Sequence, residues 1–241
     1  MNRISAVMAF LALFFVSCTA QISGSLKGDG QADLQIYAAL EPTMTGLIMR
    51  LSGTAQPDAL ILDGPAIAAS MSSAPGVASV SLKNIAPAAI QGPVQISRVS
   101  DFLARGKTGN RTQASKTPNF IVFQQGSAGG RCVVNVNRNS GPEILSLLSP
   151  EVGNYLAALM APLATGEALT KAEYLMLVGS VYGKGIADEI AQASIRTFID
   201  FPGTVQSVRG GTFSGRRAEF AIPLLDLLVL EKPLIYDVMW K

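Results

Sequence analysis

Small or apolar residues alternate with polar residues directly after residue 20. They occupy every second position over 22–26 and again over 32–38, and Asp29-Gly30 lies between the two runs. A period of two is typical of a strand with one buried face, and Asp-Gly supplies the positive φ angles of a tight turn. Residues 21–40 are therefore predicted to form a β-hairpin.

A second hairpin is predicted over 120–137. Two β-rich runs flank a glycine-rich turn at 126–130, and Cys132 alternates with Val134 and Val136 on one face. A cysteine in such a position behaves as a small buried side chain, so we expect its thiol to be unreactive.

Apolar residues spaced three and four apart predict helices elsewhere. One helix is expected over 42–51 and ends before Gly53, one or two short helices lie over 58–73, and the main helical block covers 142–192. Within that block Thr170 and Glu173 have the spacing of a capping box, in which each side chain accepts a hydrogen bond from the other residue's backbone N–H.

The period returns to two after residue 193. Strands are predicted over 195–199, 205–208, 217–222 and 234–240, in addition to shorter ones over 77–83 and 94–97. The apolar stretch 223–230 is either a short helix or a buried connection. Together these elements predict a single α+β domain, with an antiparallel sheet built from hairpins and helices packed on one face.

The N-terminus carries an export signal. Arg3 is the only charge before an apolar run over 4–16, which is shorter than the roughly 20 residues of a membrane-spanning helix and has the length of a signal-peptide core. The run ends in Phe15-Val16-Ser17-Cys18. A small residue directly before a cysteine resembles the lipobox of bacterial lipoproteins, with Phe15 in place of the usual leucine.

In that family the cysteine is diacylated and the chain is cut in front of it. The resemblance implies a signal peptide over 1–17 and a domain over 18–241, tethered through Cys18 to a bacterial membrane of the cell envelope. The alternative is an ordinary signal peptide that is cut after Ala20, in which case Cys18 is discarded. If Cys18 carries lipid, Cys132 has no partner for a disulfide.

The composition excludes several classes of catalytic and metal-binding site. The 241 residues are 49% hydrophobic and 15% charged, which excludes a disordered chain, and they include no histidine, which removes Ser-His-Asp, Cys-His and HExxH sites. Glycines at 126–130 and 183–185 lack the rest of a phosphate-binding loop. We therefore predict no catalytic residues, no metal and no cofactor, and the formal charge of +2 does not indicate nucleic acid.

One segment is basic. Between residues 98 and 138 seven basic residues stand against one acidic residue, Asp101. Such a segment suits anionic lipid or an acidic envelope partner, and its most exposed candidates are Arg105, Lys107, Arg111 and Lys116. The alternative is a solvated loop whose charge the acidic remainder of the chain neutralises after folding.

The C-terminal part resembles exported lipoproteins. The motifs are Phe201-Pro202-Gly203-x-Val205, Gly210-Gly211, Phe220-x-Ile222-Pro223, Pro233 and Trp240. The segment from Glu173 to Ile195 resembles uncharacterised spirochaetal-type lipoproteins, and the Pro-Gly-x-Val turn followed by a strand is similar to LppM-like lipoproteins. The resemblance implies a membrane-tethered α+β domain without catalytic residues.

The function expected from these features is that of a noncatalytic lipoprotein, which acts as a binding or structural module of the envelope. An alternative is a carrier or sensor of an apolar ligand such as a lipid, with 223–230 lining its pocket. An enzyme that works with carboxylates alone is a third class. A filled core favours the binding or structural module, and an apolar pocket favours the carrier or sensor. Convergent carboxylates in a cleft favour the enzyme.

Overall fold

The first hairpin lies where the alternation predicts it, in a computed structural model that describes residues 19–53, 60–103, 120–145 and 150–241. β1 (Thr19–Leu26) pairs antiparallel with β2 (Ala32–Ala39). Gly30 turns the chain at a φ of 84°, which glycine adopts without a steric penalty. At Gly24 the two backbones approach so closely that a Cβ atom would lie 2.0 Å from the Asp33 carbonyl oxygen.

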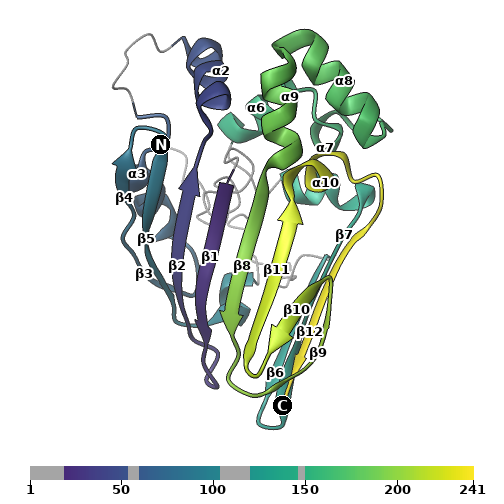
Figure 1. The fold of residues 1–241 in the computed structure, drawn as a ribbon. Helices are drawn as coiled ribbons and strands as arrows, with labels where there is room; N and C mark the ends of the chain where they lie inside the picture. Colours follow the sequence, from purple (N-terminus) through teal and green to yellow (C-terminus); the bar gives the residue numbers. More distant parts are fainter. Residues whose placement is uncertain (1–18, 54–59, 104–119, 146–149) are drawn as a thin grey trace, which may run out of the picture.

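Eight strands form a large sheet around this hairpin (Figure 1). Their order is β10-β11-β8-β1-β2-β5-β3, and β4 also pairs with β5. β1 and β8 are parallel, whereas every other described pair in this sheet is antiparallel. The remaining strands of the sheet are β3 (Val77–Val80), β4 (Lys83–Ala86), β5 (Ala89–Ile96), β8 (Ser194–Asp200), β10 (Gly211–Ser214) and β11 (Arg217–Pro223).

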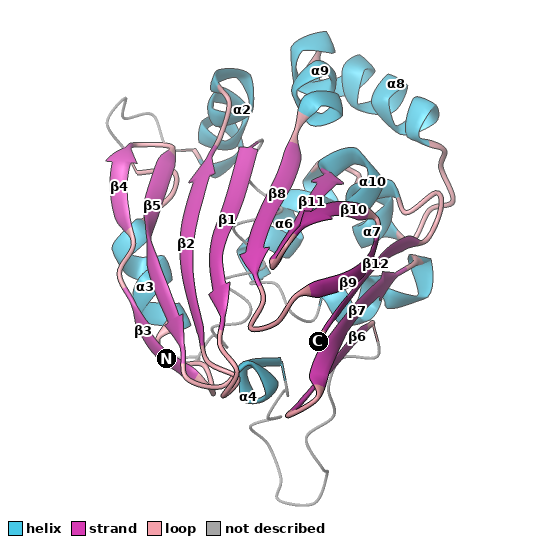
Figure 2. Ribbon diagram, turned by 60° about the horizontal axis from the view of Figure 1, so that its bottom comes forward, coloured by secondary structure: helices cyan, strands magenta, loops and turns pink. Residues whose placement is uncertain are grey.

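The second predicted hairpin belongs to a separate, smaller sheet. Its strands are antiparallel and follow the order β6-β7-β12-β9, with bounds β6 (Ile121–Gly126), β7 (Gly129–Val136), β12 (Leu234–Trp240) and β9 (Val205–Arg209). The backbone N–H of Val205 donates to the Gly215 carbonyl oxygen at 2.9 Å, which joins β9 to the turn between β10 and β11. The small sheet thus adjoins the β10–β11 edge of the large one (Figure 2).

Short helices fill the connections between strands. They are α2 (Pro42–Ser52), α3 (Gly64–Met71), α4 (Val99–Leu103), the 3₁₀ turn η1 (Arg138–Ser140), α5 (Gly141–Leu145), α6 (Pro150–Ala158), α7 (Pro162–Thr165), α8 (Lys171–Tyr182), α9 (Lys184–Gln192) and α10 (Leu224–Val229). Figure 1 shows α3 behind the large sheet and α2, α8 and α9 at one of its ends.

Local capping groups define several helix ends. Gly53 ends α2 with a φ of 68°, and the Asp63 side chain accepts a hydrogen bond from the Ala66 backbone N–H at the start of α3. The predicted capping box of α8 is confirmed, because Thr170 and Glu173 satisfy each other's backbone N–H groups at 2.8 and 3.2 Å.

The core lies on the inner face of the large sheet. Ile36, Ile90 and Val94 are buried there, and they belong to the same apolar cluster as Leu156 of α6 and Tyr174 of α8. Side chains at the intervening strand positions face outward. This division between an apolar inner face and a polar outer face follows directly from the period of two in the sequence.

The predicted α+β class, with hairpins and helices on one face of the sheet, is confirmed. The structure differs from the prediction in several details. The strand expected over 77–83 is broken at Ser81. The carbonyl oxygen of Ser81 lies so close to Gly92 that a Cβ atom on this glycine would be 1.9 Å from it. The four-residue β10 was not predicted because it is too short to show a period. Of the two alternatives stated for 223–230, the structure has the short helix, in which Leu224, Leu227 and Leu228 are buried.

Candidate functional site

The candidate site residues singled out by the sequence lie outside the described ranges. This applies to Cys18 and to the four basic candidates Arg105, Lys107, Arg111 and Lys116. The neighbouring described residues show where these segments join the fold.

The start of β1 marks one end of the large sheet. Thr19, the residue after Cys18, lies opposite Ala39 at the end of β2 and beside Ser194 at the start of β8. α2 begins three residues after β2 ends, and α9 ends two residues before β8 begins. We call this end, made of Thr19, Ala39, Ser194 and helices α2, α8 and α9, the helical end (Figure 1).

The outer face of the large sheet is polar in its centre. One row across β1, β2 and β5 places Tyr37 between Gln21 and Gln91, and the next row places Gln35 between Ser23 and Pro93. These residues occupy the polar positions of the same alternation that buries the inner face. The sequence therefore contained the signal for this surface, although sequence reasoning used only the apolar half of the pattern.

The two rows border a shallow hollow of about 380 Å³ on this outer face. Its lining residues are Gln21, Ser23, Gln35, Ile36, Tyr37, Ser81, Lys83, Gln91, Gly92 and Pro93. Among the described residues, none forms a hydrogen bond with the side-chain amides of Gln21, Gln35 or Gln91. Amides both donate and accept hydrogen bonds, and the Tyr37 ring offers an apolar face, so the lining suits a ligand rich in hydroxyl groups.

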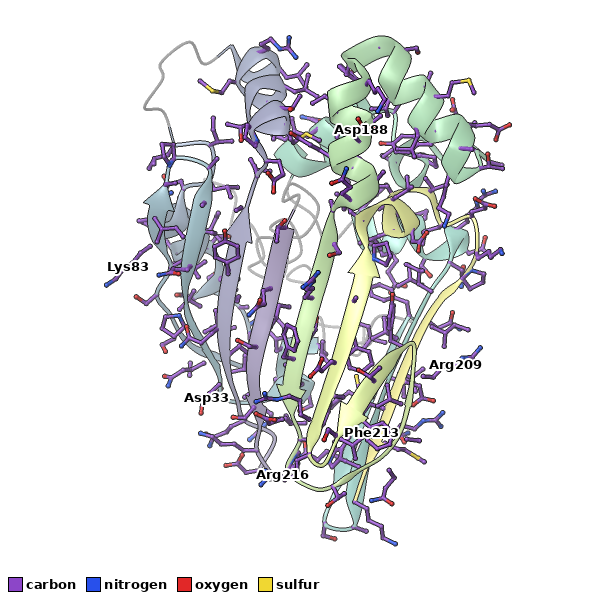
Figure 3. The ribbon with its side chains drawn as sticks, in the orientation of Figure 1. Asp33, Lys83, Asp188, Arg209, Phe213 and Arg216 are labelled. Carbon is purple, nitrogen blue, oxygen red and sulfur yellow. The ribbon has the colours of Figure 1, made fainter. Side chains whose placement is uncertain are left out.

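Charge is sparse in this hollow. Lys83, at the left edge of Figure 3, is the only charged residue of its lining. At the opposite end of the strands the charges are paired, since Lys27 contacts Asp33 at 2.6 Å and Arg217 contacts Asp200 at 2.8 Å. Hydrogen bonds from Arg217 lower the pKa of Asp200 below its ordinary value. The hollow is therefore better suited to a neutral ligand than to a highly charged one.

A second hollow of about 550 Å³ lies on the small sheet, beside the β6–β7 turn and the C-terminus. Two of its polar lining residues, Arg131 and Gln125, form hydrogen bonds within the fold. Arg131 donates to both carboxylate oxygens of Asp237 at 3.0 and 2.5 Å, and the Gln125 amide donates to the carbonyl oxygens of Lys27 and Gly28 at 2.8 and 2.9 Å. These contacts hold the two side chains in place, while the buried side-chain oxygen of Gln125 has no hydrogen-bond partner among the described residues.

The described part of the basic segment is engaged within the protein. Arg98 lies 3.4 Å from Asp101, Arg131 pairs with Asp237, and Arg138 donates to the Leu169 carbonyl oxygen at 2.9 Å. Of these three side chains only Arg131 pairs with an acidic residue outside the segment, as the expectation of internal neutralisation requires. The four candidate contact residues lie in the part that the structure leaves undescribed.

Cys132 lies on the inward face of β7, as predicted, and its side chain is partly buried. Burial, with a smaller contribution from the nearby Asp237 carboxylate, raises the pKa of its thiol to about 11. A thiol with this pKa is almost entirely protonated at neutral pH, and the thiolate is the reactive form.

Within the described ranges, no group of three or more acidic or cysteine side chains is arranged to hold a metal ion. A separate search of those ranges found no helix with both the length and the apolar composition needed to span a membrane.

Comparisons with known proteins give one similar structure. No family model matches the chain, and no curated protein is similar to it in sequence. The NMR structure of the folded domain of the Mycobacterium tuberculosis LppM protein is similar over 92% of this chain and 88% of that one, with 11% identity and a TM-score of 0.40. This likeness is too low for fold or function to be carried from one protein to the other.

Proposed function

We propose that this protein is a noncatalytic lipoprotein of a bacterial cell envelope, held at a membrane surface through Cys18. The observation that carries the proposal is the position of Cys18, which ends a signal-peptide core and directly precedes the first strand of the fold. The likeness of the segment from Glu173 to Ile195 to spirochaetal-type lipoproteins remains an expectation from the sequence.

The anchor is strong enough to act alone. Each buried methylene group of an acyl chain contributes about 0.8 kcal/mol, so that one chain gives marginal attachment and two give durable attachment. Because Thr19 already belongs to β1, the lipid is joined to the folded domain without an intervening linker.

The hollow on the outer face of the large sheet is the proposed binding surface. Its unpartnered amides and the Tyr37 ring, which is 36% exposed, favour a neutral ligand with many hydroxyl groups. In a cell envelope that chemistry belongs to glycans. Such a ligand would gain hydrogen bonds from Gln21, Gln35 and Gln91 and apolar contact with the ring.

The fold gives less support to the other two functional classes. A carrier of an apolar ligand was expected to use 223–230 as a pocket wall, yet Leu224, Leu228 and Val229 are at most 3% exposed and pack into the core. An enzyme built on carboxylates needs at least two of them in one cleft, and the lining of the outer-face hollow includes none. A smaller hollow of about 130 Å³ includes Asp226 and Glu231, but both carboxylates already accept hydrogen bonds from Lys171.

The basic segment is proposed to meet an acidic surface of the envelope. It leaves the described fold through α4, where the Val99 backbone N–H donates to the Gly30 carbonyl oxygen of the β1–β2 turn at 2.9 Å. That turn lies at the opposite end of β1 from Thr19, about 23 Å away at 3.3 Å per strand residue.

Membrane fractionation of cells that produce the Cys18→Ala variant tests the anchor. We expect the variant to leave the membrane fraction and to lose incorporation of labelled palmitate, whereas the Cys132→Ala control keeps both. A Cys18→Ala protein that stays as firmly membrane-bound as the parent contradicts the proposal.

A further inference from the structure

Exposed apolar side chains gather at the helical end. The large hydrophobic residues that stay exposed there are Leu51 of α2, Leu60 before α3, Ile85 of β4, and Met176 and Val181 of α8. Ile85 and Leu60 belong to this end because Ala86 pairs with Ala89, which pairs with Ala39, and because the Ile61 N–H donates to the Pro87 carbonyl oxygen.

α8 contributes the most exposed of these side chains. Met176 is 75% exposed and Val181 is 55% exposed, whereas Tyr174 and Val178 face the core. From Tyr174 to Gly183 the helix carries no charged residue. A helix that is apolar on both sides is normally covered on both sides. No described residue covers Met176 on the outer side of α8, so this apolar side chain is left without a protein neighbour.

The position of Thr19 shows which environment lies next to that face. Thr19 is at the helical end, and the residue before it is the proposed lipid attachment site. A lipid on Cys18 holds this end of the domain against the headgroups. Apolar side chains at such a boundary lower their free energy by entering the headgroup and acyl region, and the anchor makes this contact intramolecular.

We infer that the outer side of α8, with Met176 and Val181 at its centre, lies in the interface of the membrane that holds the Cys18 lipid. The strands of the large sheet then stand upright on that membrane, with the polar outer face turned to the side and the β1–β2 turn pointing away. This inference rests on the proposed lipid anchor.

The orientation explains two features of the fold. Figure 1 shows that α8 and α9 lie beyond the end of the large sheet, which holds α8 away from the strands. The charges of α9 do not oppose it, since Lys184 and Asp188 pair with each other at 2.5 Å. The hollow beside Tyr37 stays in water and accessible from the side, so one domain holds the membrane with one surface and a ligand with another.

Trp fluorescence in vesicles tests the inference. Met176→Trp and Phe213→Trp each add an indole at an exposed apolar position, the first at the helical end and the second near the opposite end of the sheet (Figure 3). The full-length protein is purified from cells with its lipid and reconstituted into phosphatidylcholine vesicles, with or without bromine on the acyl chains. The parent protein gives the signal of the native Trp240, which is subtracted.

We expect bromine to remove the added fluorescence of Met176→Trp, whose emission is also shifted to shorter wavelength, and to leave that of Phe213→Trp unchanged. Floating vesicles that carry the protein without quenching at 176, or with equal quenching at 213, overturn the orientation while the anchor stands. Failure of the parent to float with vesicles contradicts the anchor and the orientation together. A dimer that forms without vesicles and is lost in Met176→Asp would assign the face to a second copy of the chain and overturn the inference.

Discussion

The Glu189 carboxylate caps the first turn of α2, the helix that begins at Pro42. Its two oxygens accept hydrogen bonds from the backbone N–H groups of Thr43 at 2.9 Å and Met44 at 2.7 Å. Glu41, the residue at the N-cap position of α2, supplies no side-chain hydrogen bond. A residue of α9 thus satisfies the first turn of α2, and its negative charge suits the positive end of the helix dipole.

Removing this cap is expected to destabilise the helical end. Glu189→Ala leaves two backbone N–H groups without their partner, so the free energy of unfolding should fall by about 1–2 kcal/mol. Chemical denaturation followed by circular dichroism measures the change. Glu167→Ala is the control, because Glu167 is exposed and no described residue bonds its side chain. Equal stability of the two variants would show that the cap contributes nothing.

The same cap shows where prediction from the sequence ends. The first hairpin, α2 and the capping box of α8 were predictable, because each depends on residues close together in the chain. Glu189 and Met44 are 145 residues apart, and no spacing rule connects them. The division into two sheets has the same origin, since the pairing of β7 with β12 depends on tertiary contacts.

The candidate site follows the same division. The lipid site proposed at Cys18 rests on a resemblance that involves only neighbouring residues, whereas the hollow beside Tyr37 needs three strands brought together in one register. Trp240 gives a further example. It fits over Gly130 so closely that a Cβ atom on this glycine would lie 2.1 Å from the ring, and neither residue indicates the other in the sequence.

Cys132 should react slowly with thiol reagents in the native protein. Its pKa of about 11 lies roughly two units above that of a free cysteine, so its thiolate population at neutral pH is lower by about two orders of magnitude. Titration of the Cys18→Ala protein, native and in denaturant, measures the rate. The control is Ser127→Cys in a Cys132→Ala background, which places a thiol in the exposed β6–β7 turn. Native labelling of Cys132 as fast as that of the control would disprove the assignment.

The pair of Asp237 and Arg131 should make stability depend on pH. Hydrogen bonds from Arg131 lower the pKa of Asp237 in the folded state. A carboxyl whose pKa is lowered on folding stabilises the protein above its unfolded pKa of about 4, and this contribution disappears as the pH falls through the folded value.

We therefore expect Asp237→Asn to lower the free energy of unfolding at neutral pH by at most about 1 kcal/mol, because the Arg131 side chain is 51% exposed and solvent screens the pair. The difference from the parent should shrink as the pH is lowered below about 4. Thermal unfolding over this pH range measures it. In Asp188→Asn, whose partner Lys184 is 85% exposed, we expect little change at any pH. A deficit in Asp237→Asn that is constant with pH would point to packing instead of charge.

Loss of the Tyr37 ring should weaken glycan binding. Calorimetric titration with a chito-oligosaccharide, a neutral N-acetylated glycan, provides the probe. Tyr37→Ala removes the apolar face of the hollow, and a loss of about 1–2 kcal/mol corresponds to an affinity lower by roughly 5- to 30-fold. Gln206→Ala, which changes the second hollow, should bind as the parent does. Absence of binding by the parent, or equal affinity of both variants, contradicts the proposed binding surface.

The basic segment should bind acidic surfaces in a salt-dependent manner. The Cys18→Ala protein is used so that lipid does not hold it to the membrane, and vesicles with anionic lipid serve as the acidic probe. Replacement of Arg105, Lys107, Arg111 and Lys116 by Gln removes four charges, each of which contributes about 1 kcal/mol near an anionic surface.

We expect the parent to bind anionic vesicles at low salt, to bind neutral ones poorly, and to be released at high salt, because exposed charges are screened over about 8 Å at physiological ionic strength. The Gln variant should bind both vesicle types equally poorly. If the variant keeps the parent's affinity for anionic vesicles, the four basic residues do not contribute to binding and the segment is a solvated loop. The described arginines of the segment, Arg98, Arg131 and Arg138, already have partners in the fold.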